Sequence, residues 1–153
     1  MRSSGRAKTH ALGCMKKRRS LDEVLQSTSD VLFPAEMGER VVAVNSRDVC
    51  GDTPLHVMAW RSDRHAVKLL IESGADIDAI GDMSETPLHI ATRKGDKEIV
   101  DMLLAAGATT EIRSEFNETA LEAAEKAGGE IRKLFKRHAA QQTAARDRAK
   151  RGA

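Results

Sequence analysis

The chain contains no Tyr, one Trp and three Phe among its 153 residues. β-Sandwiches depend on aromatic and β-branched side chains to fill the space between their sheets, so this shortage argues against an all-β fold. Only three Pro interrupt the chain, whereas Leu, Ala and Glu are common. These features together favour a protein of helices that pack through small aliphatic side chains.

Cysteines and long apolar runs are also scarce. Cys14 and Cys50 are too few for a disulfide framework and match no spacing of metal ligands. We therefore expect free thiols in a reducing compartment, a cytoplasmic protein, and no metal or cofactor. No run of about 18 apolar residues is present, so we expect no membrane span. Residues 1–14 lack the apolar stretch of a secretory or lipoprotein signal, and Met15 is an alternative translation start.

Charge is distributed unevenly along the chain, although the formal net charge is only +2. Residues 1–20 hold seven Lys or Arg and no acid, and residues 132–153 hold eight Lys or Arg against Asp147. The middle, residues 21–131, has ten basic and 22 acidic residues, which gives it a net charge of −12. Because an acidic surface repels phosphates, this body is not expected to bind nucleic acid or an anionic membrane.

The strongest positive signal is an internal repeat of 33 residues. Residues 53–56 read TPLH, residues 86–89 read TPLH again, and residues 119–122 read TALE. The match continues downstream, where SGAD at residues 73–76 corresponds to AGAT at residues 106–109. Agreement in register over some 30 residues is a strong repeat signal, whereas one tetrapeptide would be weak.

The residues of one unit predict two short helices. Thr53 has the chemistry of a helix N-cap, and Pro54 suits the first helical position, where its missing N–H is not needed. Ser62-Asp63 ends this helix and begins a second one, which Gly74 closes. Helices of two or three turns are not stable alone, so each unit has to stack on its neighbours.

The TPLH tetrapeptide, the paired leucines at 69–70, the Gly-Ala-Asp turn and the 33-residue period resemble the ankyrin repeat. The resemblance implies an all-α fold, a solenoid of antiparallel helix pairs with β-hairpin-like turns between repeats. The chain then divides into a basic disordered tail (1–19), a degenerate N-terminal capping repeat (20–47), two ankyrin repeats (48–80 and 81–113), a C-terminal capping repeat (114–136) and a basic Ala/Arg/Gln tail (137–153). This last tail is either a frayed helical extension or disordered.

Sequence features at both ends fit the capping units. Ser20 and Glu23 have the spacing of a capping box, in which two side chains and two backbone N–H groups exchange hydrogen bonds at a helix start. In the last unit, Ala120 and Glu122 replace the Pro and His of the repeat. A more polar last unit suits a terminal repeat, because its outer face meets water.

The histidines of the repeat, His56 and His89, invite a catalytic or metal-binding interpretation. No third ligand stands at a usual spacing, and the resemblance implies that each imidazole bridges the Thr hydroxyl and the turn of an adjacent unit. The run that begins at Asp76 resembles a calcium loop but has Ile80 where an oxygen ligand belongs. No nucleophile elbow or phosphate-binding loop is present. We therefore predict a protein that is not an enzyme.

The ankyrin resemblance implies protein–protein recognition through a concave face built from hairpin tips and the exposed sides of the first helices. Matching positions of the repeats form three rows on this face. The acidic row is Asp52, Glu85 and Glu118; the apolar row at the tips is Cys50, Met83 and Phe116; the row along the helices is Trp60, Arg61, Arg93, Lys94 and Lys126. Trp60 stands out because it breaks a row that is otherwise basic.

Two questions stay open at this point. Trp60 is either the anchor of the binding face or a packing residue against the N-terminal cap at residues 21–33. We predict an adaptor or inhibitor that is a monomer and binds an acidic or apolar element of a protein partner. The alternative function is nucleic-acid tethering through the two basic tails, which the acidic body and the lack of aromatic residues in the tails disfavour.

Overall fold

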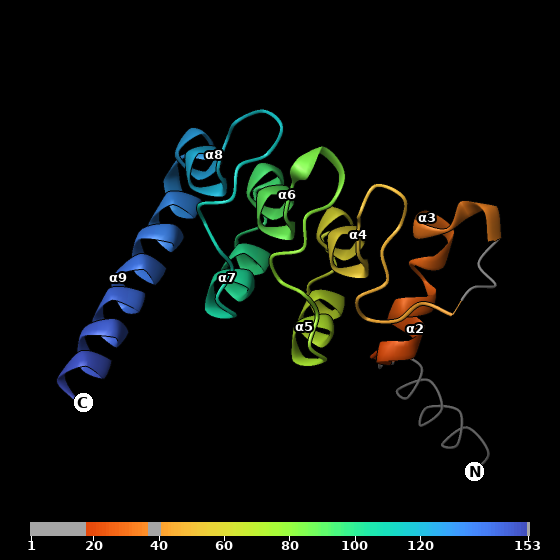
Figure 1. Ribbon diagram of the computed structural model, residues 1–153, viewed down its shortest axis with the longest axis horizontal. Helices are drawn as coiled ribbons and strands as arrows, with labels where there is room; N and C mark the ends of the chain where they lie inside the picture. The colour runs from red at the N-terminus through yellow and green to blue at the C-terminus, as the bar shows by residue number, and fades with distance from the viewer. Residues whose placement is uncertain (1–17, 37–40, 153) are drawn as a thin grey trace, which may run out of the picture.

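The computed structural model describes residues 18–36 and 41–152, and among these it is all-helical, as predicted (Figure 1). The expected disordered tail lies outside the described residues except at Arg18 and Arg19. The helices are α2 (Leu21–Gln26), α3 (Ser29–Leu32), α4 (Pro54–Trp60), α5 (Arg64–Glu72), α6 (Pro87–Lys94), α7 (Lys97–Ala105), α8 (Ala120–Ala127) and α9 (Gly129–Arg151), with short 3₁₀ turns η1 (Pro34–Glu36) and η2 (Asp82–Ser84). The described residues contain no strand, only an isolated antiparallel bridge between Arg113 and Thr119.

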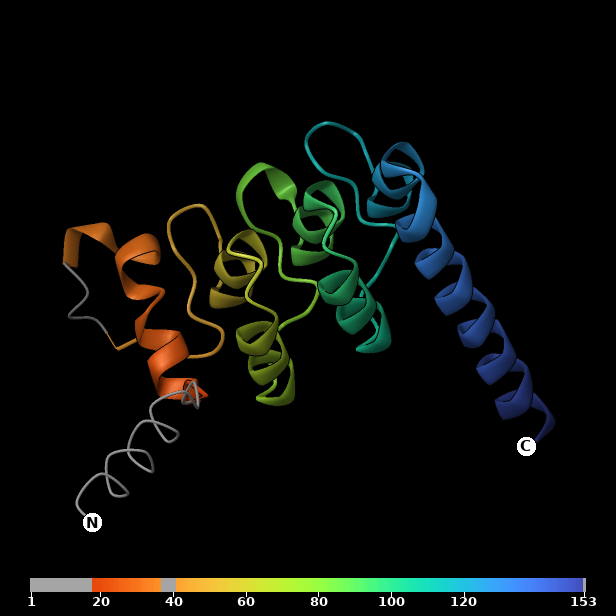
Figure 2. The same cartoon turned by 180° about the vertical axis from the view of Figure 1, so that it is seen from behind.

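The helices form pairs that follow one another in a row (Figures 1 and 2). In each pair the first helix, α4, α6 or α8, packs on the second, α5, α7 or α9. Neighbouring pairs also touch, first helix to first helix and second to second. Helices α2 and α3 occupy the N-terminal end of the row, and the loops before α4, α6 and α8 all stand out on the same side (Figure 1).

Local hydrogen bonds explain where the helices begin. The N–H of Ser20 donates to the Glu23 carboxylate (2.8 Å) and the N–H of Glu23 donates to the Ser20 hydroxyl (3.3 Å), which confirms the capping box. The Asp63 carboxylate accepts from the N–H of Ala66 (3.1 Å) and caps α5. Ser62 just before it has φ of 56°, a left-handed conformation that lets the chain reverse between α4 and α5.

The core is continuous from unit to unit because equivalent positions are buried in each repeat. Leu55 and Leu88 are both fully buried in the first helices, and Leu70 and Leu103 are fully buried in the second. Each of these pairs is separated by one repeat length. A short helix therefore gains its stability from the apolar face of the next pair rather than from its own length.

Buried histidines connect one unit to the next. His56 Nδ1 accepts from the N–H of Thr53 (3.1 Å), and its Nε2 lies 3.1 Å from the carbonyl oxygen of Glu85, to which it donates. His89 makes the same bonds in its own repeat and reaches the carbonyl of Glu118 at 3.2 Å. The structural role expected for both imidazoles is confirmed, and neither ring has a nitrogen left for a metal or a substrate.

The last repeat uses a carboxylate in place of the imidazole. The N–H of Thr119 donates to Glu122 Oε2 (2.9 Å), and the N–H of Glu122 donates to the Thr119 hydroxyl (3.2 Å). The bond from Thr119, followed by the charge of Arg113, lowers the pKa of Glu122. A carboxylate can cap α8 as well as His does, but it cannot donate a hydrogen bond to a further unit.

Helix α9 is longer than a second helix of an ankyrin-like unit. It is continuous across residue 137, where we expected a separate tail, so a helical extension describes this region rather than disorder. Ile131 and Phe135 are buried against the body, and His138 Nε2 lies 2.7 Å from the Asp101 carboxylate of α7. From residue 139 onward every described residue is exposed. The first part of α9 thus completes the last unit, and the rest extends beyond it.

The buried histidines predict that acid destabilises the fold. Burial lowers the pKa of His56 and of His89 below the ordinary value of 6.5, so both stay neutral when folded while the unfolded chain takes up protons. The free energy of unfolding should therefore fall as the pH drops below 6.5, by up to about 1.4 kcal/mol per pH unit for each histidine. Urea unfolding followed by circular dichroism between pH 7.5 and pH 5.5 measures this slope.

A matched set of variants tests the assignment. His89→Gln keeps an acceptor for the N-cap N–H but cannot titrate, so it should reduce the slope. Gln141→Ala, at an exposed position of α9 that does not titrate, should leave the slope unchanged. An unaltered slope in the double variant His56→Gln/His89→Gln would show that other groups carry the pH dependence.

Candidate functional site

The loops before the first helices present the apolar row to solvent. We call residues 48–52, 81–85 and 114–118 the hairpin tips. At the first tip the Asp48 carboxylate accepts from the N–H of Cys50 (2.8 Å), which tightens the turn. Met83, at φ 54°, adopts the left-handed conformation that side chains rarely take. Cys50 is exposed, as are Met83 at 45% and Phe116 at 63% of their full accessible surface.

The acidic and basic rows form ion pairs in two of the repeats. The Arg93 guanidinium binds both oxygens of the Glu85 carboxylate, one of them at 2.8 Å, and Lys126 Nζ lies 2.7 Å from Glu118 Oε1. Both pairs join residues eight positions apart, on either side of a helix start. The same spacing of eight residues is present in the sequence, although the pairing of the two rows was not predicted from it.

These pairs are more than exposed surface contacts, because their acidic partners are shielded. The Glu85 side chain is only 10% exposed, and Glu118 Oε1 is shielded from solvent with the Lys126 ammonium 2.7 Å away. The hydrogen bond and charge of Glu118 in turn raise the pKa of Lys126. Arg93 and Lys126 therefore form ion pairs with carboxylates of their own repeats. Less unpaired positive charge is present on this face than the sequence suggests.

Asp52 has no such partner, because Trp60 stands where the other repeats carry Arg93 and Lys126. Its carboxylate instead accepts from the N–H of Asp82 at 3.0 Å and ties the first hairpin tip to the second. Asp52 therefore has a bridging role in the structure that its place in the acidic row did not predict.

Trp60 lies at the end of α4 and contacts α6. Its side chain is 55% exposed, with Lys94 Nζ 5.0 Å and the Arg93 guanidinium carbon 6.0 Å from the ring centroid. Lys94 also donates to the Trp60 carbonyl. Arg61, the next residue, points the other way and donates to the Ser27 carbonyl of the N-terminal unit at 2.8 Å. The contact with the N-terminal cap is therefore made by Arg61, while the indole is held between two cations of the following repeat.

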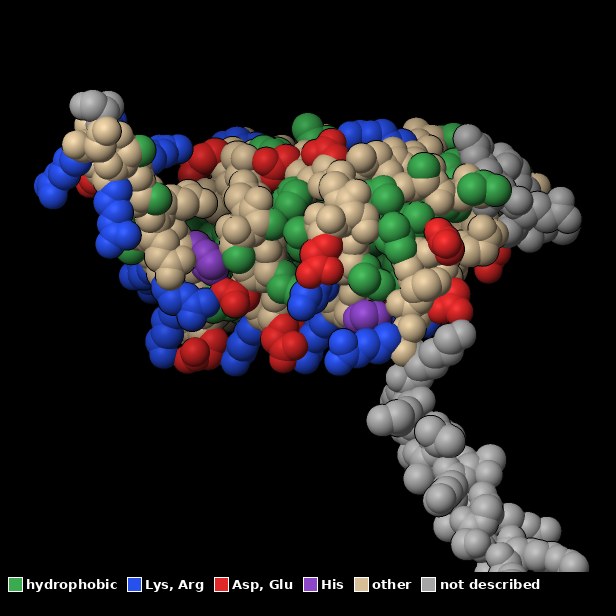
Figure 3. Space-filling view, turned by 90° about the horizontal axis from the view of Figure 1, so that it is seen from below, with side chains coloured by type: hydrophobic (Ala, Val, Ile, Leu, Met, Phe, Trp, Pro, Cys, Tyr) green, Lys and Arg blue, Asp and Glu red, His purple; other side chains and the backbone are tan. Residues whose placement is uncertain are grey.

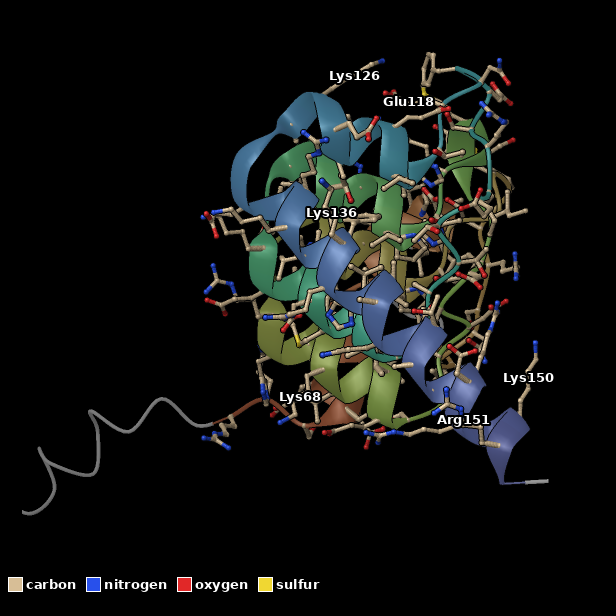
Figure 4. All side chains as sticks on the ribbon, turned by 90° about the vertical axis from the view of Figure 1, so that its left-hand side faces the viewer. Lys68, Glu118, Lys126, Lys136, Lys150 and Arg151 are labelled. Carbon is tan, nitrogen blue, oxygen red and sulfur yellow. The ribbon has the colours of Figure 1, made fainter. Side chains whose placement is uncertain are left out.

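A hollow of about 290 Å³ opens between α6 and α8 on the same face. It is lined by Glu85, His89, Arg93, Ser114, Phe116, Glu118, Ala123, Lys126 and Ala127. Figure 4 shows Lys126 and Glu118 close together at the end of the molecule opposite to Lys150 and Arg151. The hollow thus brings together Glu85 and Glu118 of the acidic row, Arg93 and Lys126 of the row along the helices, and Phe116 of the apolar row. Ser114 and Ala123 were not predicted, since small residues at these positions carry no distinct sequence signal.

Other kinds of site find no support among the described residues. No group of three or more His, Cys, Asp or Glu in this part of the chain could hold a metal ion. Local desolvation, followed by the charges of Asp48, Asp82 and Asp52, raises the pKa of the Cys50 thiol, which disfavours the nucleophilic thiolate. No described helix is both long enough and apolar enough to cross a membrane.

Comparison with known protein families identifies the repeats. The family model for ankyrin repeats (3 copies) matches residues 30–114, more than half of the chain. The chain belongs to the ankyrin repeat family. The match begins inside the N-terminal unit and stops before α8, so α2 at one end and the last helix pair at the other lie outside it. Ankyrin repeats generally mediate protein–protein interaction. No curated protein matches the chain.

The exposed position of Trp60 predicts that it contributes little to folding. Trp60→Ala removes an indole that is more than half exposed, so the free energy of unfolding should fall by less than about 1 kcal/mol. Leu88→Ala, at a fully buried position in α6, should cost about 2–5 kcal/mol. Urea unfolding of both variants measures the difference. Equal losses would show that the indole is a packing residue of the ankyrin core.

Proposed function

We propose that this ankyrin repeat protein is a non-enzymatic interaction module, an adaptor or inhibitor that binds a partner protein through the concave face of a short solenoid. This face consists of the hairpin tips and the exposed ends of α4, α6 and α8. We further propose that the protein acts as a monomer in the cytoplasm. The observation that carries the proposal is the exposed Trp60 held beside Arg93 and Lys94.

Trp and Arg are enriched at the energetic centres of protein interfaces. Lys94 and Arg93 fix the orientation of the indole in the free protein, so less conformational freedom is lost when a partner covers it. Phe116 and Met83 add exposed apolar surface along the tips, at equivalent positions of successive repeats. A row of this kind suits an extended partner element that runs across several repeats.

The paired charges favour an apolar partner element over an acidic one. Arg93 and Lys126 already have carboxylate partners, and an acidic ligand would have to compete with Glu85 and Glu118 for them. The hollow is lined by Phe116, Ala123 and Ala127 beside charged side chains that are already paired, so it offers apolar contacts to an anchoring side chain. We therefore expect the partner to place an aliphatic or aromatic side chain in this hollow.

The test begins with affinity purification from the native source and continues with the purified partner. Binding measured by calorimetry should weaken at least 30-fold for Trp60→Ala, the loss of about 2 kcal/mol that defines an interface hot spot. Phe116→Ser should also weaken binding, because it removes apolar surface at the edge of the hollow.

Val31→Ser and Val41→Ser provide a matched control. Both remove exposed apolar side chains, at 52% and 87% exposure, from the N-terminal unit rather than from the proposed face. They should leave the affinity unchanged. If the partner binds folded Trp60→Ala and Phe116→Ser as tightly as the original protein, the concave face is not the binding site.

A further inference from the structure

The outer part of α9 is a helix without a packing partner. We call residues 139–151 the outer helix. Every one of its residues is exposed, and it diverges from the body so that a hollow of about 520 Å³ separates Gln142 and Ala145 from residues 107–111. Figure 1 shows it running away from the row of helix pairs. No apolar contact requires this extension, so packing of the ankyrin fold does not account for it.

Most of the positive charge of α9 is free. Eight Lys or Arg lie on the helix, and two are paired: Lys133 with Glu130 at 2.8 Å, and Arg137 with Asp101. The other six make no ion pair with any described residue; they are Arg132, Lys136, Arg146, Arg148, Lys150 and Arg151. Asp147 is the single acid of the outer helix. Figure 3 shows Lys and Arg side chains prominent on the projecting end of the molecule.

The free charges are aligned as well as numerous. With 3.6 residues per turn, Arg132, Lys136, Arg146 and Lys150 fall within about a quarter of the helix circumference. At a rise of 1.5 Å per residue they span about 27 Å along the axis. We call these four residues the basic stripe. Arg132 and Lys136 lie on the part of α9 that packs on the body, whereas Arg146 and Lys150 lie on the outer helix, which runs away from a body with a net charge of −12 over residues 21–131.

We propose that the basic stripe and its flanking arginines bind the phosphate backbone of double-stranded DNA without sequence specificity. The remaining positions of the outer helix are mostly Ala, at 139, 140, 144, 145 and 149, which keeps the helix slender. The DNA major groove is about 12 Å wide and admits an α-helix with side chains of this size. This surface is separate from the concave face and does not depend on it.

The composition of the outer helix argues against a membrane surface as the ligand. A helix that lies in a membrane interface needs large apolar side chains opposite its basic face. At 3.6 residues per turn the outer helix has Gln141, Ala145 and Arg148 there, none of which is a large apolar side chain. In the sequence, the acidic body argues against nucleic-acid binding. Because the outer helix projects from the body, this argument applies to the repeats and not to the outer helix.

Fluorescence anisotropy of the full chain with a labelled 20-base-pair DNA duplex, from 50 to 200 mM NaCl, tests the proposal. The triple variant Arg146→Gln/Lys150→Gln/Arg151→Gln removes three free charges with good helix formers in their place. The affinity at 100 mM NaCl should fall at least tenfold. The slope of log K against log salt should become shallower by about 2.7, since each lost phosphate contact removes about 0.9.

The matched control removes three charges from the body instead, as Arg64→Gln/Lys68→Gln/Lys97→Gln on α5 and α7. It should retain most of the affinity, and circular dichroism should show equal helix content in both variants. Equal weakening by the two triple variants would overturn the proposal, because binding would then follow total charge alone. So would the absence of saturable binding at 50 mM NaCl, or tighter binding to phosphatidylcholine–phosphatidylserine vesicles than to the duplex.

Discussion

The neutral imidazoles of His56 and His89 are the interaction on which the rest of the structure depends. Each accepts a hydrogen bond at the start of its own helix and donates one to a backbone carbonyl of the following unit. Two short helices cannot form a stable unit in isolation, so the position of one pair relative to the next determines whether either forms. The imidazole fixes that relation because a buried ring with both nitrogens bonded tolerates little displacement.

The same repetition that builds the scaffold also shapes its binding surface. Glu85–Arg93 and Glu118–Lys126 occupy equivalent places in two repeats, and each pair holds its charges within its own unit. A partner protein is then recognised by residues outside these ion pairs. Trp60 takes the place that Arg93 and Lys126 hold in the following repeats and so has no acidic partner, and its ring lies near two cations of the next repeat. The repeat that carries Trp60 therefore presents an exposed aromatic side chain to a partner.

The sequence was sufficient for the helix pairs, because their signals are local and occur twice. TPLH at a fixed spacing specifies the cap, the helix start and the bridging histidine, and all three appear as expected. The pairing of the acidic and basic rows was not predicted: the spacing of eight residues is present in the sequence, but the direction in which the long side chains turn is set only in the folded structure. The direction of the Arg61 side chain, which turns away from Trp60, was not predicted for the same reason. The continuation of α9 was left open because Ala, Gln and Arg form helices readily but give no apolar stripe that would require one.

An array of stacked units has an exposed face at each end. These two faces are complementary because equivalent faces pack on each other inside the array. Without a cover, the last face of one molecule could receive the first face of another, and head-to-tail contacts of that kind generate filaments. Helix α9 is the second helix of the last pair; its Ile131 and Phe135 are buried against the body, and its Arg137 and His138 bind Asp101 of α7. Glu122 removes the hydrogen-bond donor that a further unit would need. A further unit stacked on α8 would therefore lack the hydrogen bond that joins the earlier units.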